Sequence, residues 1–233
     1  MNIGIAGHML LLEPREFENA YEVYDSSIDK RTKIYKNLKA SAEESGKKLL
    51  SDTEVSMIEG ACGSLSMHPH IGPLLESCDK ELVAMWNHSK TGIDCKAKID
   101  CIGDDFILDI KFTGQEIDPR NDYKLFSLIY ERSYYRQLTF YNEGFEKKHL
   151  YIAFVETNPP FEVTWVDLMD DHKWCELGRR EIDVACQRYI DFLAWKENGS
   201  PVEFSYPQEK RKVTCPDWAL DRISRLEREV NEF

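Results

Sequence analysis

The stretch "KIDCIGDDFILDIKFTG", residues 98–114, combines strand-like apolar residues with charged side chains. Its second half, "FILDIKF", is an apolar strand that carries Asp109 and Lys111 two positions apart. Side chains alternate between the two faces of a strand, so Asp109 and Lys111 point the same way. The opposite face is apolar and carries Phe106, Leu108, Ile110 and Phe112. A charged pair on a strand of this kind is costly unless something compensates the charge.

A metal ion between two carboxylates would compensate it. Asp100 ends the preceding strand, and a hairpin turn over residues 103–105 can bring Asp100 beside Asp109. Magnesium prefers hard oxygen ligands, and the Ile110 carbonyl could supply another oxygen. Lys111 could hold or help to deprotonate a metal-bound water. The spacing therefore predicts a metal-dependent phosphodiesterase site. The alternative is a salt bridge between Asp109 and Lys111 on an edge strand.

The rest of the chain alternates between helical and strand patterns. We expect helices at 1–12, 31–46, 52–66, 69–77, within 118–144, at 170–197 and from Pro216. We expect strands at 81–88, 93–101, 105–112, 148–157 and 161–168. Ser51 and Glu54 form a capping box at the start of the 52–66 helix. This order predicts an α/β fold with a central mixed sheet of about five strands flanked by helices.

Length and composition indicate one sizeable hydrophobic core, because 42% of the 233 residues are hydrophobic. No run approaches the ~18 apolar residues of a membrane helix, and the first residues lack the pattern of a signal peptide. The seven cysteines are an odd number at irregular spacing without a CxxC pair, which argues against a disulfide framework or a zinc site. We therefore expect a cytoplasmic protein that has no membrane partner.

The formal net charge of −12 counts by itself against a nucleic-acid partner, because phosphate binding requires lysine and arginine. Divalent ions at an acidic site can offset carboxylates locally, and basic residues can gather on one face. The segment "IDKRTKIYKNLK", residues 28–39, is locally basic. It could contact DNA or form a solvated helix face, and the sequence favours neither.

The stretch at residues 98–114 resembles the core motif of the PD-(D/E)xK nucleases, which include lambda exonuclease and the RecB-like enzymes. Over residues 5–222 the chain resembles the RecE-type 5′→3′ exonucleases of phages and prophages. The matching segments occur in the same order as in that family: "AGHMLLLEPREFENAYEV" (6–23), "DKRTKIYK" (29–36), "TGIDCKAKIDCI" (91–102), "LDIKFT" (108–113), "YYRQLTFYNEGFE" (134–146) and "TCPDWALDR" (214–222).

The resemblance implies a metal site. Asp100 and Asp109 would be the metal carboxylates, and Ile110 would offer its main-chain carbonyl. His8 matches the family's helix histidine, which ligates or neighbours the metal. By itself, His8 would more often be read as a capping or core histidine.

The resemblance also implies the catalytic groups around that metal. Lys111 would be the catalytic lysine, and Gln137 and Tyr141 match a Q-x-x-x-Y pattern on one helix face. These two residues could orient Lys111 or contact the DNA backbone. Alternatively, they belong to an amphipathic helix whose aromatic side chain packs in the core.

The resemblance implies a single PD-(D/E)xK nuclease domain over residues 1–233, with N-terminal helices in 1–78, a catalytic core in 79–168 and C-terminal helices in 169–233. The implied activity is a Mg²⁺-dependent exodeoxyribonuclease, with Mn²⁺ as a substitute, that digests double-stranded DNA ends 5′→3′ and leaves a 3′ single strand. The implied partners are further copies of the chain in a homo-oligomeric ring and a single-strand annealing protein. The alternatives are an endonuclease or Cas4-like nuclease of the same superfamily, and a catalytically silent module that binds DNA ends or proteins.

Overall fold

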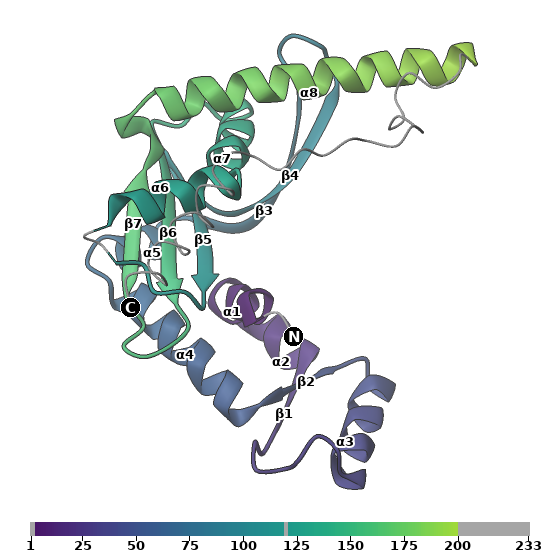
Figure 1. Ribbon diagram of the computed structural model, residues 1–233, viewed down its shortest axis with the longest axis vertical. Coiled ribbons are helices and arrows are strands. Elements are labelled where there is room, and N and C mark those ends of the chain that lie inside the picture. The colour runs from purple at the N-terminus through teal and green to yellow at the C-terminus, as the bar shows by residue number, and fades with distance from the viewer. Residues whose placement is uncertain (1–2, 119–120, 200–233) are drawn as a thin grey trace, which may run out of the picture. The chain divides into compact units, whose positions relative to one another are not determined.

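The computed structural model describes residues 3–118 and 121–199 (Figure 1). The chain divides into two compact units, Met1–Ile190 and Asp191–Phe233, and the candidate site lies in the first. The helix expected from Pro216 and the motif at 214–222 lie outside the described residues. The single domain over 1–233 therefore stays a prediction.

A central sheet of five strands organises the first unit, in the order β3-β4-β5-β6-β7. The strands are β3 (Asp79–Asn87), β4 (Asp94–Ile102), β5 (Phe106–Thr113), β6 (His149–Glu156) and β7 (Val163–Asp167). The β5–β6 pair is parallel and the other three pairs are antiparallel. The mixed α/β sheet that the sequence predicts is confirmed.

The strand that carries Asp109 and Lys111 lies in the middle of this sheet. β6 pairs with β5 along the whole of β5, from Phe106 to Thr113, and β4 lies on its other side. The alternative predicted a salt bridge between Asp109 and Lys111 on an edge strand; the salt bridge is present, but the edge position is wrong. A central strand is covered on both faces, so its charged side chains cannot simply turn to solvent.

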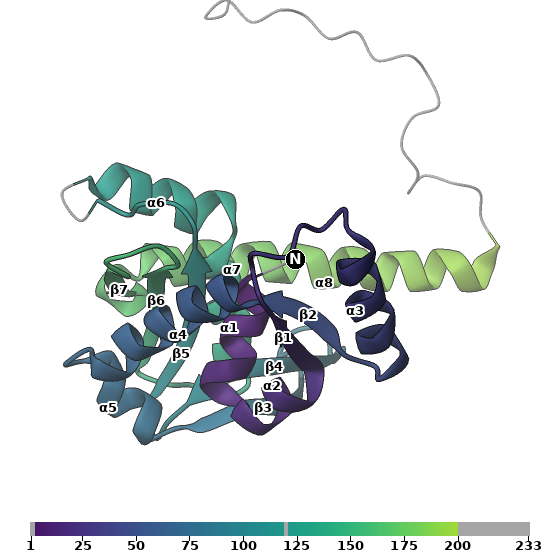
Figure 2. The same ribbon diagram turned by 90° about the horizontal axis from the view of Figure 1, so that it is seen from below.

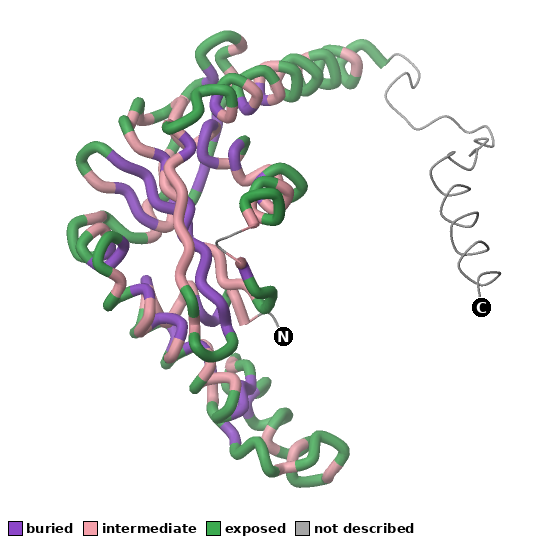
Figure 3. The backbone as a smooth tube through the Cα atoms, turned by 60° about the vertical axis from the view of Figure 1, so that its left-hand side comes forward, coloured by how far each residue is buried: buried purple, intermediate pink, exposed green. Residues whose placement is uncertain are grey.

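Helices cover both faces of the sheet. On one face, α1 (Ile3–Leu12) and α4 (Asp52–Met67) lie side by side (Figure 2) and share a core with Leu108 and Ile110. On the other face, α6 (Asp122–Glu131) and α7 (Tyr134–Glu143) share a core with Ile107. The buried segments accordingly run along the strands (Figure 3). This double cover makes the sheet a rigid support for side chains between the layers.

Local sequence signals explain several helix boundaries. The Ser51–Glu54 capping box is present at the start of α4, as predicted. α1 ends before Pro14, and α2 (Pro14–Ala20) begins there because proline is favoured in the first turn. The remaining helices are α3 (Lys33–Glu44), α5 (Ile71–Glu76), the 3₁₀ turn η1 (Leu168–Asp170) and α8 (Lys173–Asn198).

A small second sheet was not predicted. β1 (Tyr21–Tyr24) and β2 (Lys48–Ser51) pair in parallel, with α3 between them in the chain. The basic segment 28–39 runs into α3, and its Arg31 side chain is exposed and paired with Asp29 at 2.6 Å. In the part of the chain that the structure describes, no helix combines the length and the apolar character that crossing a bilayer requires.

Candidate active site

The β4–β5 hairpin places Asp100 next to Asp109. The register pairs Cys101 with Leu108 and Ile102 with Ile107, and continuing it by one position sets Asp100 opposite Asp109. The regular pairing stops there, where Asp100 Oδ2 accepts the Ile110 backbone N–H at 2.9 Å. The two predicted metal carboxylates are thus neighbours across two strands. A ligand role for the Ile110 carbonyl stays a prediction.

His8 approaches Asp100 from α1. Its Nδ1 atom lies 3.5 Å from Asp100 Oδ2. The helix can come this close because Gly7 has no side chain, since a Cβ there would lie 2.6 Å from the Phe112 ring. Burial lowers the pKa of His8 and outweighs the nearby carboxylates, which raise it. The imidazole is therefore neutral at pH 7, which is the form that binds metal ions.

Asp109 and Lys111 form a buried ion pair. Asp109 is 1% exposed, and its Oδ2 atom lies 2.6 Å from Lys111 Nζ. Burial raises the pKa of Asp109 to about 6, and the Asp100 charge adds to this effect while Lys111 opposes it. Burial alone lowers the pKa of Lys111, but the charge of Asp109 reverses the balance and the net pKa lies above its usual value. Without a metal, Lys111 is thus a proton donor rather than a base.

Helix α7 connects the pair to the Q-x-x-x-Y motif. Gln137 donates through Nε2 to Asp109 Oδ1 at 2.9 Å and to Tyr141 Oη at 2.7 Å, and its Oε1 accepts from Lys111 Nζ at 3.3 Å. Lys111 Nζ also lies 4.7 Å from the centre of the Tyr134 ring. Tyr141 also packs partly against the apolar core, as the structural alternative expects, and its functional role stays a prediction. Gln137 therefore fixes the orientation of both charged groups.

Glu81, which was not predicted to act, lies in the same site. One carboxylate oxygen of Glu81, one of Asp100 and a ring nitrogen of His8 all lie within 4.8 Å of one another. Pairing of Lys80 with Cys101 and of Leu82 with Ile99 sets Glu81 opposite Asp100. Counting residue pairs back from the turn between β3 and β4 places Glu81 opposite Asp100, so the sequence could have identified Glu81 as a site residue.

The residues present fit a hard divalent cation. Four carboxylates, from Glu13, Glu81, Asp100 and Asp109, face two ammonium groups, from Lys98 and Lys111, which leaves two negative charges unbalanced. Carboxylate oxygens suit Mg²⁺ and Mn²⁺. The cation itself stays a prediction.

The site opens to solvent through a cavity of about 440 Å³, whose lining includes His8, Glu81, Asp100 and Lys111.

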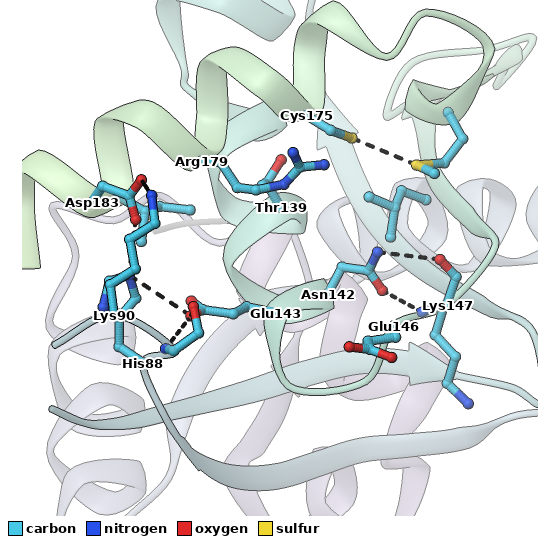
Figure 4. Close-up of a pocket in the computed structure, with 14 residues that line it drawn as sticks. His88, Lys90, Thr139, Asn142, Glu143, Glu146, Lys147, Cys175, Arg179 and Asp183 are labelled. Carbon is cyan, nitrogen blue, oxygen red and sulfur yellow. Dashed lines mark hydrogen bonds and ion pairs between the residues drawn. The ribbon is translucent and has the colours of Figure 1, made fainter. Parts of the chain in front are cut away.

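A separate cavity of about 450 Å³ lies among the β3–β4 turn, α7 and α8 (Figure 4). Four of its ionisable side chains, those of His88, Lys90, Glu143 and Asp183, contact one another. Lys90 contacts Asp183, and His88 Nε2 lies 3.3 Å from Asp183 and 3.7 Å from Glu143. None of the predicted site residues lines this second cavity.

The chain is similar to a known family of domains. The family model described as "PDDEXK-like domain of unknown function (DUF3799)" matches residues 1–203. No curated protein matches. A crystal structure from Eubacterium rectale, described as "Putative exonuclease", is 10% identical, with coverage of 94% of this chain and 92% of that chain and a TM-score of 0.49. LHK-Exo in complex with dAMP is 12% identical, with coverage of 82% and 92% and a TM-score of 0.25. Both TM-scores are too low to carry an inference about this chain.

Proposed function

The chain belongs to this family of PDDEXK-like domains, and on that premise we propose that it is a metal-dependent nuclease that digests linear duplex DNA from its ends. One observation carries the proposal: the buried Asp109–Lys111 pair, held by Gln137, lies beside Asp100 in the middle of the sheet. A purely structural core would favour apolar residues here, because a buried ion pair gains little stability over them.

Asp100, Asp109 and His8, with the Ile110 carbonyl, would hold the cation. A bound Mg²⁺ or Mn²⁺ would supply Lewis acidity toward a phosphodiester and lower the pKa of a bound water. The chain's own residues supply the remaining functions. Lys111 presents a protonated amine that can donate a hydrogen bond to a phosphate oxygen or to the attacking water. Gln137 holds that amine and Asp109 in one relative position.

One feature supports DNA rather than a smaller phosphodiester. The resemblance to RecE-type enzymes covers most of the chain, in the same order of motifs. The proposed 5′→3′ polarity, the ring-shaped oligomer and the annealing partner rest on the resemblance alone.

The direct test of the proposed function compares linear, nicked and covalently closed duplexes, each with Mg²⁺ or with a chelator. We expect digestion of linear DNA only, loss of digestion with chelator, and loss in Lys111→Ala. A matched control is Lys90→Ala, which removes a lysine that lies at the second cavity and pairs there with Asp183. Lys90→Ala should retain activity.

Two other outcomes would identify a different function. Cutting of closed circles would identify an endonuclease of the same superfamily. Binding of DNA ends without cleavage in any divalent metal would identify a catalytically silent module. End-labelled substrates show which strand shortens and so test the polarity. Light scattering of the intact protein tests the ring, because a monomer in solution would contradict it.

A further inference from the structure

Glu81 has an unusual position in the sheet. It belongs to β3, yet its φ angle is 53°, in the left-handed region that a non-glycine residue occupies at a cost. The β3–β4 register includes the pairs on both sides of Glu81 but not the pair of Glu81 with Asp100. The local distortion therefore falls at the position that faces a metal-site carboxylate.

Two carboxylates at opposite positions of neighbouring strands repel each other. The Glu81 side chain is 12% exposed and that of Asp100 is 17% exposed, so water screens this repulsion only in part. Lys98 contacts Glu81 but also lies 3.0 Å from Glu13, so its charge is shared between two acids. The single positive charge of Lys98 therefore does not balance the negative charges of Glu81 and Asp100.

The donor geometry fits a cation at this point. Atoms of His8, Glu81 and Asp100 lie within 4.8 Å of one another, close enough to bind one ion from three directions. All three residues line the same cavity, so a hydrated cation can reach them from solvent.

We propose that Glu81 is a protein ligand of the divalent cation, together with His8 and Asp100. This inference deepens the proposed function and rests on it only in requiring a metal at this site. It assigns a metal-binding role to the first strand of the sheet, in addition to the hairpin that carries Asp100 and Asp109.

The test measures Mn²⁺ binding to the full chain by titration calorimetry, and the electron paramagnetic resonance signal of free Mn²⁺ provides a second readout. Glu81→Gln keeps the size of the side chain and removes its charge. We expect its Mn²⁺ affinity to fall at least tenfold, a loss typical of disrupting a metal site. The matched control is Glu13→Gln, which removes the same charge from the other partner of Lys98 and should change the affinity less than twofold.

Two further variants separate ligation from a structural role. Glu81→Asp keeps the charge but withdraws the oxygen by one methylene, so a ligand role predicts weaker Mn²⁺ binding in a folded protein. Lys98→Met removes the lysine that competes for Glu81 and should leave the affinity unchanged or raise it. If Glu81 serves only to pair with Lys98, then Glu81→Gln and Lys98→Met will lower the melting temperature equally and neither will change Mn²⁺ affinity. That result overturns the inference.

The outcome is separable from the proposed function. Unchanged Mn²⁺ affinity in Glu81→Gln, with DNA cleavage by the parent protein intact, refutes the role of Glu81 alone. Reduced Mn²⁺ affinity in Glu81→Gln, with no cleavage by the parent protein on any DNA, confirms the ligand and refutes the nuclease.

Discussion

Asp109 Oδ2 and Lys111 Nζ lie 2.6 Å apart on a central strand, where Asp109 is 1% exposed. The two residues are separated by one position, so their side chains share the face that packs against α7. Each charge depends on the other for its stability in the sheet. The chemistry and the stability of this site are therefore coupled.

Removing one partner of the pair should destabilise the protein more than removing both. Lys111→Met leaves a buried Asp109 carboxylate without its cation, which costs about 3 kcal/mol when a buried pair is broken. In Asp109→Asn/Lys111→Met neither charge is left, so most of this loss should be recovered. Urea unfolding of the two single variants and the double variant gives the coupling energy. Additive losses would show that the ion pair is energetically unimportant.

Gln137 should matter for both rate and metal binding, because it orients Lys111 and the proposed ligand Asp109. Its amide bridges Asp109, Lys111 and Tyr141. Gln137→Ala should lower kcat by about 10–100-fold and should also weaken Mn²⁺ binding, as expected for a residue that hydrogen-bonds a metal-ligating carboxylate. Unchanged kcat and unchanged Mn²⁺ affinity in Gln137→Ala would contradict this role.

Tyr141→Phe should lower kcat less than Gln137→Ala does. It removes one acceptor of the Gln137 amide and leaves the contacts with Asp109 and Lys111. The kcat of Tyr141→Phe should therefore fall less than that of Gln137→Ala. A larger loss in Tyr141→Phe would assign a direct role in catalysis to the tyrosine.

Metal-free protein should lose stability as pH rises through 6. Burial raises the pKa of Asp100 to about 6, whereas an unfolded aspartate titrates near 3.8. Between these values the folded state binds more protons, so the free energy of unfolding falls as pH rises and the penalty is complete above pH 6. Two pKa units correspond to about 3 kcal/mol at most.

Asp100→Asn should relieve this penalty. In the presence of chelator the variant should melt at a higher temperature than the parent at pH 7.5. The difference should shrink as the pH falls from 6 and vanish below about pH 3, where Asp100 is protonated in both states. The variant should also be inactive. Parallel melting profiles from pH 4 to 8 would contradict the assigned environment of Asp100.

Gly7 should tolerate no larger side chain. A Cβ at this position would lie 2.6 Å from the Phe112 ring, so Gly7→Val must push α1 away from β5 and carry His8 with it. We expect a loss of about 1–3 kcal/mol from overpacking, together with weaker Mn²⁺ binding. Adding Phe112→Leu should recover part of both losses. If the second substitution recovers neither, the close contact is not what positions His8.

Much of this fold could be predicted because its signals are local. The alternation in 105–112, the turns that flank it and the Ser51–Glu54 capping box each depend on a few adjacent residues, and all three correspond to observed elements. The β1–β2 pair was missed because each strand has four residues, which is too short for alternation to show. Its parallel pairing also joins segments that lie far apart in the chain.

The candidate site was predicted in part for the same reason. Asp109 and Lys111 share a strand face, and Gln137 and Tyr141 share a helix face, so spacing alone predicts that the two members of each pair lie close together, as the structure shows. Their joint role came from the resemblance and stays a prediction. Glu81 was missed because its relation to Asp100 depends on the hairpin register and on a backbone distortion that residue types do not signal.

The most direct test of the central claim is an anomalous difference map from crystals soaked in Mn²⁺ and measured at the manganese absorption edge. We predict a peak within coordinating distance of the Asp100 and Asp109 carboxylates, about 2.1–2.3 Å, and the peak should be absent from Asp100→Asn crystals. A fully occupied manganese peak elsewhere in a protein that cleaves DNA, with none beside Asp100, would contradict the account.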